Sequence, residues 1–158
     1  MANIENSQKF SNLSSANFTD MKKLVFIVED NLVQQKLLQV HFEEMLDNYN
    51  VRSFANPDDL FSHLKEKPFA VVLDHFFPDK KDKTGLHYLR DLRKNNPSIP
   101  VIYYTSLDDA IVREEVLALG AEQYIIKNSA SLVRLRTALD LIHKKNARKG
   151  FLRKLFNR

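Results

Sequence analysis

Five short apolar segments alternate with longer segments of helical periodicity along the middle of the chain. The short segments cover residues 24–28, 49–54, 69–74, 99–104 and 123–126. The first and third are almost continuously apolar, as in a strand buried on both faces, whereas 49–54 alternates like a more exposed strand. This alternation of strands and helices predicts an α/β fold, in which a five-stranded parallel sheet lies between two helical layers.

Proline and glycine mark where the predicted helices begin and end. Pro57 is expected near the first turn of the second helix, and Pro68 follows its end. Gly120 is expected to terminate the fourth helix, because glycine readily adopts the left-handed conformation found there. The predicted N-terminal caps are Ser106 or Asp108 for the fourth helix and Ser129 or Ser131 for the fifth.

Composition narrows the class of protein. The chain has 158 residues, of which 44% are hydrophobic and 28% charged, as in an ordinary globular domain. It contains no cysteine, which excludes disulfides and thiolate chemistry. Apolar runs stay well short of the roughly 20 residues of a membrane span, and the N-terminal segment lacks the apolar core of a secretory signal. We therefore expect a cytoplasmic protein.

Positive charge is concentrated at the C-terminal end. Residues 144–158 contain seven Lys or Arg and no acid, so residues 1–143 hold 17 basic and 20 acidic residues, a net charge of −3. Phe151, Leu152, Leu155 and Phe156 lie among these basic residues. This pattern fits a short helix on a membrane surface or partner protein, or a continuation of the fifth helix. The expected organisation is a flexible leader (1–21), one domain (22–143) and a basic amphipathic tail (144–158).

Polar residues follow four of the five predicted strands. Because the carboxyl ends of parallel strands meet at one edge of the sheet, these side chains are expected to converge there. Carboxylates suit a hard cation such as Mg²⁺, while a lysine and a hydroxyl stabilise charge on a transferring phosphoryl group. Asp74 is the candidate nucleophile. The converging residues are Glu29, Asp30, Asp74, Thr105, Ser106 and Lys127.

Four motifs resemble those of receiver domains of two-component response regulators. They are Val-Glu-Asp-Asn at 28–31, Val-Val-Leu-Asp at 71–74 with a following Pro and Gly, Pro-Val-Ile-Tyr-Tyr-Thr-Ser at 100–106, and Gly-Ala-Glu-Gln-Tyr-Ile-Ile-Lys at 120–127. The resemblance covers residues 22–143, and the motifs occur in the family's order and spacing. It implies a three-layer, flavodoxin-like fold with strand order 2-1-3-4-5.

The resemblance also implies roles for the site residues. Asp74 would accept a phosphoryl group from a histidine kinase or a histidine phosphotransfer protein. Mg²⁺ would be held by Glu29, Asp30 and Asp74 with the backbone carbonyl of Phe76. Lys127 would pair with the phosphoryl oxygens.

The same resemblance implies a switch and an output. Thr105 would move to bond the phosphoryl group, and Tyr124 would swing inward when Thr105 is engaged. Since no DNA-binding domain is expected after the fifth helix, an unknown downstream protein would bind the face formed by the fourth helix, fifth strand and fifth helix. Such a chain is a signalling protein that assists only its own phosphorylation and dephosphorylation, and is not otherwise an enzyme.

Other interpretations remain open from the residues alone. One interpretation is that Glu29, Asp30 and Asn31 serve only to cap the following helix and complement its dipole. His75 is expected to be packed or exposed rather than to form a catalytic dyad with Asp74, because neighbours on a strand point to opposite faces. A pseudo-receiver that binds partners without phosphorylation is the main alternative. A hydrolase with an aspartyl nucleophile is disfavoured, because Phe76 stands where a second acid would be needed.

Four features depart from the family's usual pattern. Glu29 replaces the commoner Asp, and Asn128 stands where proline is usual, which leaves the geometry of the Lys127–Asn128 peptide bond open. The loop 78–85 is about three residues longer than usual and carries three lysines, which we interpret as a solvated insertion. Phe76 and Leu107 flank the expected path of hydrolytic water and are bulky and apolar, so we expect a long-lived phosphoryl group.

Overall fold

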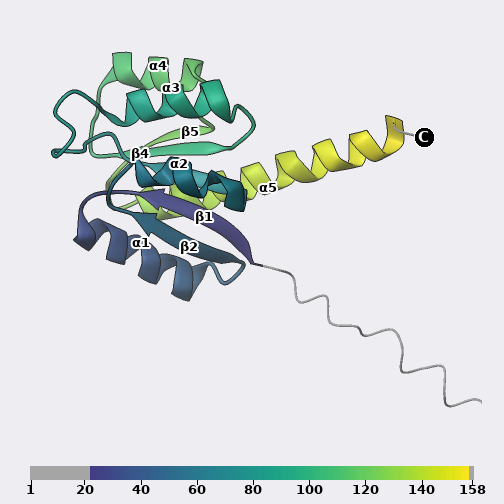
Figure 1. Ribbon diagram of the computed structural model, residues 1–158. Coiled ribbons are helices and arrows are strands. Elements are labelled where there is room, and N and C mark those ends of the chain that lie inside the picture. The colour runs from purple at the N-terminus through teal and green to yellow at the C-terminus, as the bar shows by residue number, and fades with distance from the viewer. Residues whose placement is uncertain (1–21, 157–158) are drawn as a thin grey trace, which may run out of the picture.

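The computed structural model describes residues 22–156, and five parallel strands form a single sheet at its centre (Figure 1). The strand order is β2-β1-β3-β4-β5, which confirms the expected topology. The predicted leader and the last two residues of the tail lie outside the described part. The strands are β1 (Lys23–Val28), β2 (Tyr49–Phe54), β3 (Ala70–Leu73), β4 (Val101–Thr105) and β5 (Gln123–Ile126).

Helices cover both faces of the sheet, so the fold has the three layers predicted. One apolar core joins α1 and α5 to the sheet side of Val25 and Ile27, and the other joins α2, α3 and α4 to the side of Phe26 and Val28. This division follows from the alternation of side chains along a strand. The helices are α1 (Leu32–Met45), α2 (Asp59–His63) with the 3₁₀ turn η1 (Leu64–Glu66), α3 (Gly85–Asn95), α4 (Ala110–Ala118) and α5 (Ser131–Phe156).

The parallel register brings the strand ends to one edge. Val28, the last residue of β1, pairs with both Phe54 and Leu73. Asp74 directly follows β3, and its N–H donates to the carbonyl of Val28 at 3.0 Å. At the other side of the sheet, the N–H of Lys127 donates to the carbonyl of Thr105 at 2.8 Å.

The C-terminal end of α4 lies where the sequence predicted it. The N-terminal caps of α4 and α5 differ from those predicted. Gly120 has a φ of +83° after α4, as predicted. The N-cap of α4 is Asp109, not Ser106 or Asp108, and its Oδ1 accepts from the N–H groups of Ile111 and Val112, both at 2.9 Å. The predicted cap Ser131 is instead the first residue of α5, and its buried hydroxyl donates to the carbonyl of Asn128 at 2.8 Å.

The helices bury a narrower stripe than their apolar residues suggest. In α1 only Leu38 and Phe42 are buried, and in α4 only Val116. A straight helix touches a sheet along a single line of residues, so apolar residues to either side of that line remain in water. The exposed ones include Leu32, Val33, Leu37, Met45, Ile111 and Leu117.

Arg93 ties α3 to the segments that precede β4 and β5. Its guanidinium donates to the carbonyls of Leu119 at 2.9 Å and of Ile99 and Gly120 at 2.8 Å. Burial lowers the pKa of Arg93. Its guanidinium nevertheless stays charged at neutral pH, because the pKa of a free guanidinium lies far above 7. We expect Arg93→Met to lower the free energy of unfolding in urea by about 2 kcal/mol, because three charged hydrogen bonds to backbone carbonyls are lost, two of them partly buried.

The control for this prediction is another arginine of α3. Arg90 pairs with Glu115, and both side chains are more than 40% exposed. Exposed ion pairs contribute little, so Arg90→Met should change stability by less than about 1 kcal/mol. Equal losses in the two variants would contradict the role assigned to Arg93.

The last helix is longer than the domain requires. α5 runs for 26 residues without interruption, so the described part of the basic tail continues it, as one of the sequence-based alternatives proposed. Its far half extends away from the body (Figure 1). Within residues 22–156, no helix combines the length and apolar character needed to cross a membrane.

Candidate functional site

Three carboxylates meet at the edge where β1 and β3 end. Glu29 is 2% exposed and Asp74 is 6% exposed, whereas Asp30 is half-buried. One oxygen from each lies within 4.8 Å of the others. Buried acids this close repel one another, so the cluster needs a positive partner.

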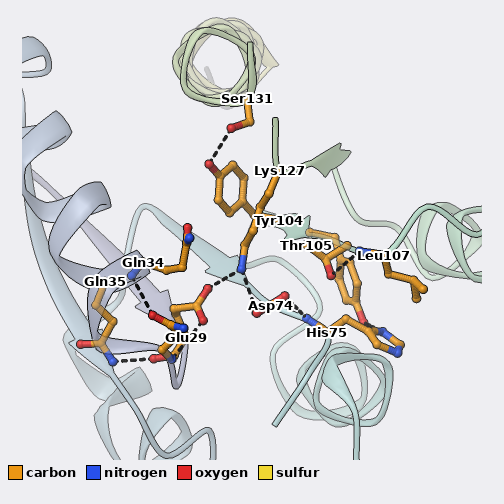
Figure 2. Close-up of polar contacts among 12 residues, drawn as sticks. Glu29, Gln34, Gln35, Asp74, His75, Tyr104, Thr105, Leu107, Lys127 and Ser131 are labelled. Atoms are coloured by element: carbon orange, nitrogen blue, oxygen red, sulfur yellow. Dashed lines mark hydrogen bonds and ion pairs between the residues drawn. The ribbon is translucent and has the colours of Figure 1, made fainter. Parts of the chain in front are cut away.

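Lys127 supplies that positive charge from the end of β5. Its Nζ lies 2.5 Å from Oε2 of Glu29 and 2.9 Å from Oδ2 of Asp74 (Figure 2). The ammonium also lies 5.6 Å from the centre of the Tyr104 ring. A single lysine thus bridges the ends of β1 and β3, which are separated from it by 98 and 53 residues in sequence.

Burial and charge oppose each other at this site. Burial raises the pKa of Glu29, and Asp74 raises it further, while the bond from Lys127 works against both. Burial alone would lower the pKa of Lys127, but Asp74 and Glu29 outweigh it, so the pKa is raised. Lys127 is therefore fully charged at neutral pH.

The backbone around Asp74 is held closely. Oδ1 of Asp74 accepts from the N–H of His75 at 2.6 Å, and the carbonyl of His75 accepts from the N–H of Gly85 at 2.8 Å. A Cβ on residue 85 would lie 2.0 Å from the carbonyl oxygen of Asp74. Only glycine therefore allows α3 to begin this close to the third strand.

His75 packs beneath the site rather than joining Asp74 in a catalytic pair. It is 8% exposed, and its Nδ1 lies 2.7 Å from the hydroxyl of Tyr103. Burial lowers the pKa of His75, although Asp74 opposes this. Of the two placements expected for His75, packed or exposed, the structure shows the packed one. The contact between His75 and Tyr103 was not predicted, because the two residues are 28 positions apart in the sequence. The alternation of side chains along β4 indicates only which face of the sheet Tyr103 lies on, not its partner.

A second tyrosine supports Lys127 from the opposite face of β4. The hydroxyl of Tyr104 lies 2.8 Å from Oγ of Ser131, which anchors the ring beside the lysine stem (Figure 2). Gln35 of α1 similarly donates to the carbonyl of Glu29. Neither support could be predicted from the residue pattern, since Ser131 was expected only as a helix cap.

Thr105 and Tyr124 meet on one residue of the loop after β4. Oγ1 of Thr105, which is fully buried, accepts from the N–H of Leu107 at 3.2 Å. The hydroxyl of the half-buried Tyr124 donates to the carbonyl of Leu107 at 2.8 Å. Its ring stacks on Tyr103 at 5.5 Å between centroids. The threonine and tyrosine proposed as a switch are thus coupled through one peptide segment.

The structure describes two of the departures from the family pattern, the side chain of Phe76 and the peptide bond before Asn128. The side chain of Phe76 is 46% exposed, with its ring 4.8 Å from that of His75. The described residues contain no cis peptide bond, so the bond between Lys127 and Asn128 is trans. The metal role of the Phe76 carbonyl stays a prediction.

A family model, Response regulator receiver domain, matches residues 25–140. The chain belongs to this family. The match covers most of the chain and includes Glu29, Asp74, Thr105 and Lys127, so the resemblance read from the motifs is confirmed. This receiver domain also has curated relatives. It is 27% identical over 127 residues to the transcriptional regulatory protein CssR of Bacillus subtilis, which covers 78% of the chain and 54% of the relative.

A second relative is the probable transcriptional regulator ycf27 of Porphyridium aerugineum. It is 33% identical over 107 residues, which is 67% of this chain and 42% of the relative. The chain therefore spans about half the length of these curated relatives, which are transcriptional regulators by name.

Solved receiver domains share the fold. The BeF3-activated N-terminal receiver domain of Klebsiella pneumoniae RstA is 29% identical, with a TM-score of 0.63 over 74% of this chain and 98% of that one. The receiver domain of a putative Luxo repressor from Vibrio parahaemolyticus has a TM-score of 0.71 at 20% identity, over 83% of this chain and 97% of that one. The second likeness supports the fold alone.

Proposed function

We propose that this receiver domain accepts a phosphoryl group on Asp74 and switches protein binding in response. The donor is a phosphohistidine on a histidine kinase or a histidine phosphotransfer protein, as the family membership favours. A carboxylate oxygen of Asp74 attacks phosphorus, an O–P bond forms, and the N–P bond of the donor breaks. The electron pair of the broken bond stays on the imidazole nitrogen, and Asp74 becomes an acyl phosphate.

The acid cluster fits Mg²⁺. Three carboxylates with oxygens within 4.8 Å, two of them buried, match the hard oxygen ligands that this ion prefers. Glu29, Asp30 and Asp74 would hold it, together with the backbone carbonyl of Phe76. The ion would offset negative charge on the incoming phosphoryl oxygens.

Lys127 and Thr105 complete the binding of the phosphoryl group. Lys127 already lies 2.9 Å from Asp74, so a group added to that carboxylate comes within reach of its ammonium. Thr105 has a buried hydroxyl at the end of the neighbouring strand. Positive charge and a hydroxyl donor at these positions stabilise the charge of the transition state as well as the product.

The output arises at the loop after β4. When the Thr105 hydroxyl turns to a phosphoryl oxygen, the N–H of Leu107 loses its acceptor, and the loop that also binds Tyr124 moves. Changes at Tyr124 then alter the surface of α4, β5 and α5, where a downstream protein binds. The chain acts on no substrate other than its own phosphoryl group.

The bridge from Lys127 to Asp74 and Glu29 is the observation that carries this proposal. We expect a small phosphodonor such as acetyl phosphate, with Mg²⁺, to add one phosphoryl group to the intact protein, as measured by mass spectrometry. Asp74→Asn should remain unmodified, and EDTA should prevent the reaction. The matched control is Asp79→Asn, an exposed acid in the next loop, which should react like the wild type. A wild-type protein that stays unmodified would favour the pseudo-receiver.

A long lifetime of the phosphoryl group is a separate expectation. Phe76 and Leu107 offer no group that can orient water toward the acyl phosphate. We expect the phosphorylated protein to persist for minutes after the donor is removed, and Phe76→Gln to shorten its lifetime severalfold. Decay should be followed by intact mass against time, with Phe77→Leu as a buried control. Loss of the phosphoryl group from the wild type within seconds would contradict the expectation.

A further inference from the structure

The far half of α5 makes no use of the domain core. Ile142 is the last buried residue of the helix, and residues 143–156 are all exposed. This segment also contains Gly150, and nothing lies within 4 Å of the place where its Cβ would be. A helical segment of this length is marginal in water without a surface to pack on, and glycine weakens it further.

Four large apolar residues gather on one side of this segment. Phe151, Leu152, Leu155 and Phe156 are 64%, 50%, 55% and 81% exposed. Positions i, i+1, i+4 and i+5 of a helix lie on the same face, so the four side chains form one apolar cluster. Along the axis the cluster spans about 7.5 Å, at about 1.5 Å per residue.

Basic residues surround the apolar cluster. Lys144, Lys145, Arg148 and Lys149 precede it, Arg153 and Lys154 lie within it, and residues 141–156 contain no acid. Lys145 is paired with both carboxylate oxygens of Glu122, at 2.8 and 2.9 Å. The other five have no carboxylate within ion-pair distance among residues 22–156.

We infer that this segment, residues 144–156, docks the receiver domain on a membrane surface that contains anionic lipids. The apolar cluster lies farthest from the domain, and most of the basic residues lie between it and the body (Figure 1). This order matches the order met on entering a bilayer from water, with anionic headgroups outside and acyl chains within.

Two other occupants of this face fit its charge and apolar residues less well. If the segment packed against the same segment of a second copy, six positive charges of one copy would face six of the other. Neither segment contains an acid that could pair with them. A nucleic acid would satisfy the charges but leave two phenylalanines and two leucines in water. A lipid surface satisfies both features at once.

The test is flotation of the intact protein with vesicles. We expect binding to phosphatidylcholine vesicles that contain phosphatidylserine, little binding to phosphatidylcholine alone, and weaker binding at high salt. The double variants Phe151→Gln with Leu155→Gln and Arg148→Glu with Lys149→Glu should each lower the partition coefficient at least about tenfold. The matched controls are Ile111→Gln with Val133→Gln and Lys65→Glu with Lys94→Glu, which replace exposed residues elsewhere and should bind as the wild type does.

A fluorescent reporter locates the inserted part. The chain contains no tryptophan, so Phe156→Trp introduces a single probe at the apolar cluster, and its emission should shift to the blue on acidic vesicles. The emission of His143→Trp, at the base of the segment, should shift much less. Absence of vesicle binding would overturn the inference. So would binding that the apolar double variant leaves unchanged, or dimerisation in sedimentation that this variant abolishes.

Discussion

Lys127→Ala is expected to slow phosphorylation of Asp74 by about 100-fold and to destabilise the domain at neutral pH. The variant removes the ammonium that lies 2.5 Å from Glu29 and 2.9 Å from Asp74, and both carboxylates are almost fully buried. Loss of one charge-stabilising donor commonly costs about 10²–10³ in rate. Breaking a buried ion pair from one side costs about 3–5 kcal/mol, because the remaining charges stay uncompensated.

The stability effect has a defined pH dependence. In the wild type the pKa of Glu29 is already raised by burial, and removing Lys127 raises it further. A carboxyl group with a higher pKa in the folded than in the unfolded state stabilises the protein while it is protonated. That contribution is complete at pH values below the pKa of the unfolded state, and it is lost as the pH rises through the pKa of the folded state. The difference in unfolding free energy between variant and wild type should therefore be small near pH 4 and grow toward pH 7. Urea titrations at both pH values measure it.

Magnesium and a second lysine provide controls for Lys127→Ala. Millimolar Mg²⁺ should stabilise the variant more than the wild type, because it supplies charge that the lysine no longer provides. Lys80 pairs with Asp58 at 2.5 Å, but that carboxylate is 49% exposed, so Lys80→Ala should change stability by less than about 1 kcal/mol. A Lys127→Ala protein as stable and as reactive as the wild type would contradict the central role of this ion pair.

Gly85→Ala is expected to impair both folding and phosphorylation. The added methyl group would lie 2.0 Å from the carbonyl oxygen of Asp74 and 2.7 Å from the hydroxyl of Tyr103. The first of these neighbours is backbone, so the start of α3 and the acceptor segment must move apart. We expect a loss of about 3 kcal/mol in the free energy of unfolding, with slower phosphoryl transfer because Asp74 is displaced.

Gly150 offers the matched control in the same chain. Nothing lies within 4 Å of the position of its Cβ, and it belongs to the exposed part of α5. Gly150→Ala should stabilise the helix by up to about 1 kcal/mol, seen as increased helical circular dichroism. Equal stability of Gly85→Ala and the wild type would show that α3 and the third strand separate without cost.

The sequence predicted the fold and the convergence of the acids for a simple reason. The apolar run 70–73 ends abruptly at Asp74, and the run 24–28 ends at Glu29, so a parallel sheet had to place both acids at one edge. The opposed lysine followed from the same rule. The supports below the site did not, because the contacts of His75 with Tyr103 and of Tyr104 with Ser131 join residues 28 and 27 positions apart. No local pattern carries such information.

Helix boundaries were less predictable than the strands. Asp108 and Asp109 are adjacent acids with equal capping propensity, and only the backbone path selects Asp109. In α1 and α4 the apolar period was visible, but not which apolar residues would meet the sheet. The length of α5 was left open because a basic segment with apolar residues fits either a separate surface helix or a continuation of the fifth.

Chemical mapping of the phosphorylated residue tests the central claim most directly. Borohydride reduces an acyl phosphate of aspartate to homoserine, so treated protein can be digested and each residue assigned by tandem mass spectrometry. We predict homoserine at position 74, formed only after incubation with phosphodonor and Mg²⁺. Homoserine at another aspartate, with position 74 intact, would contradict the account.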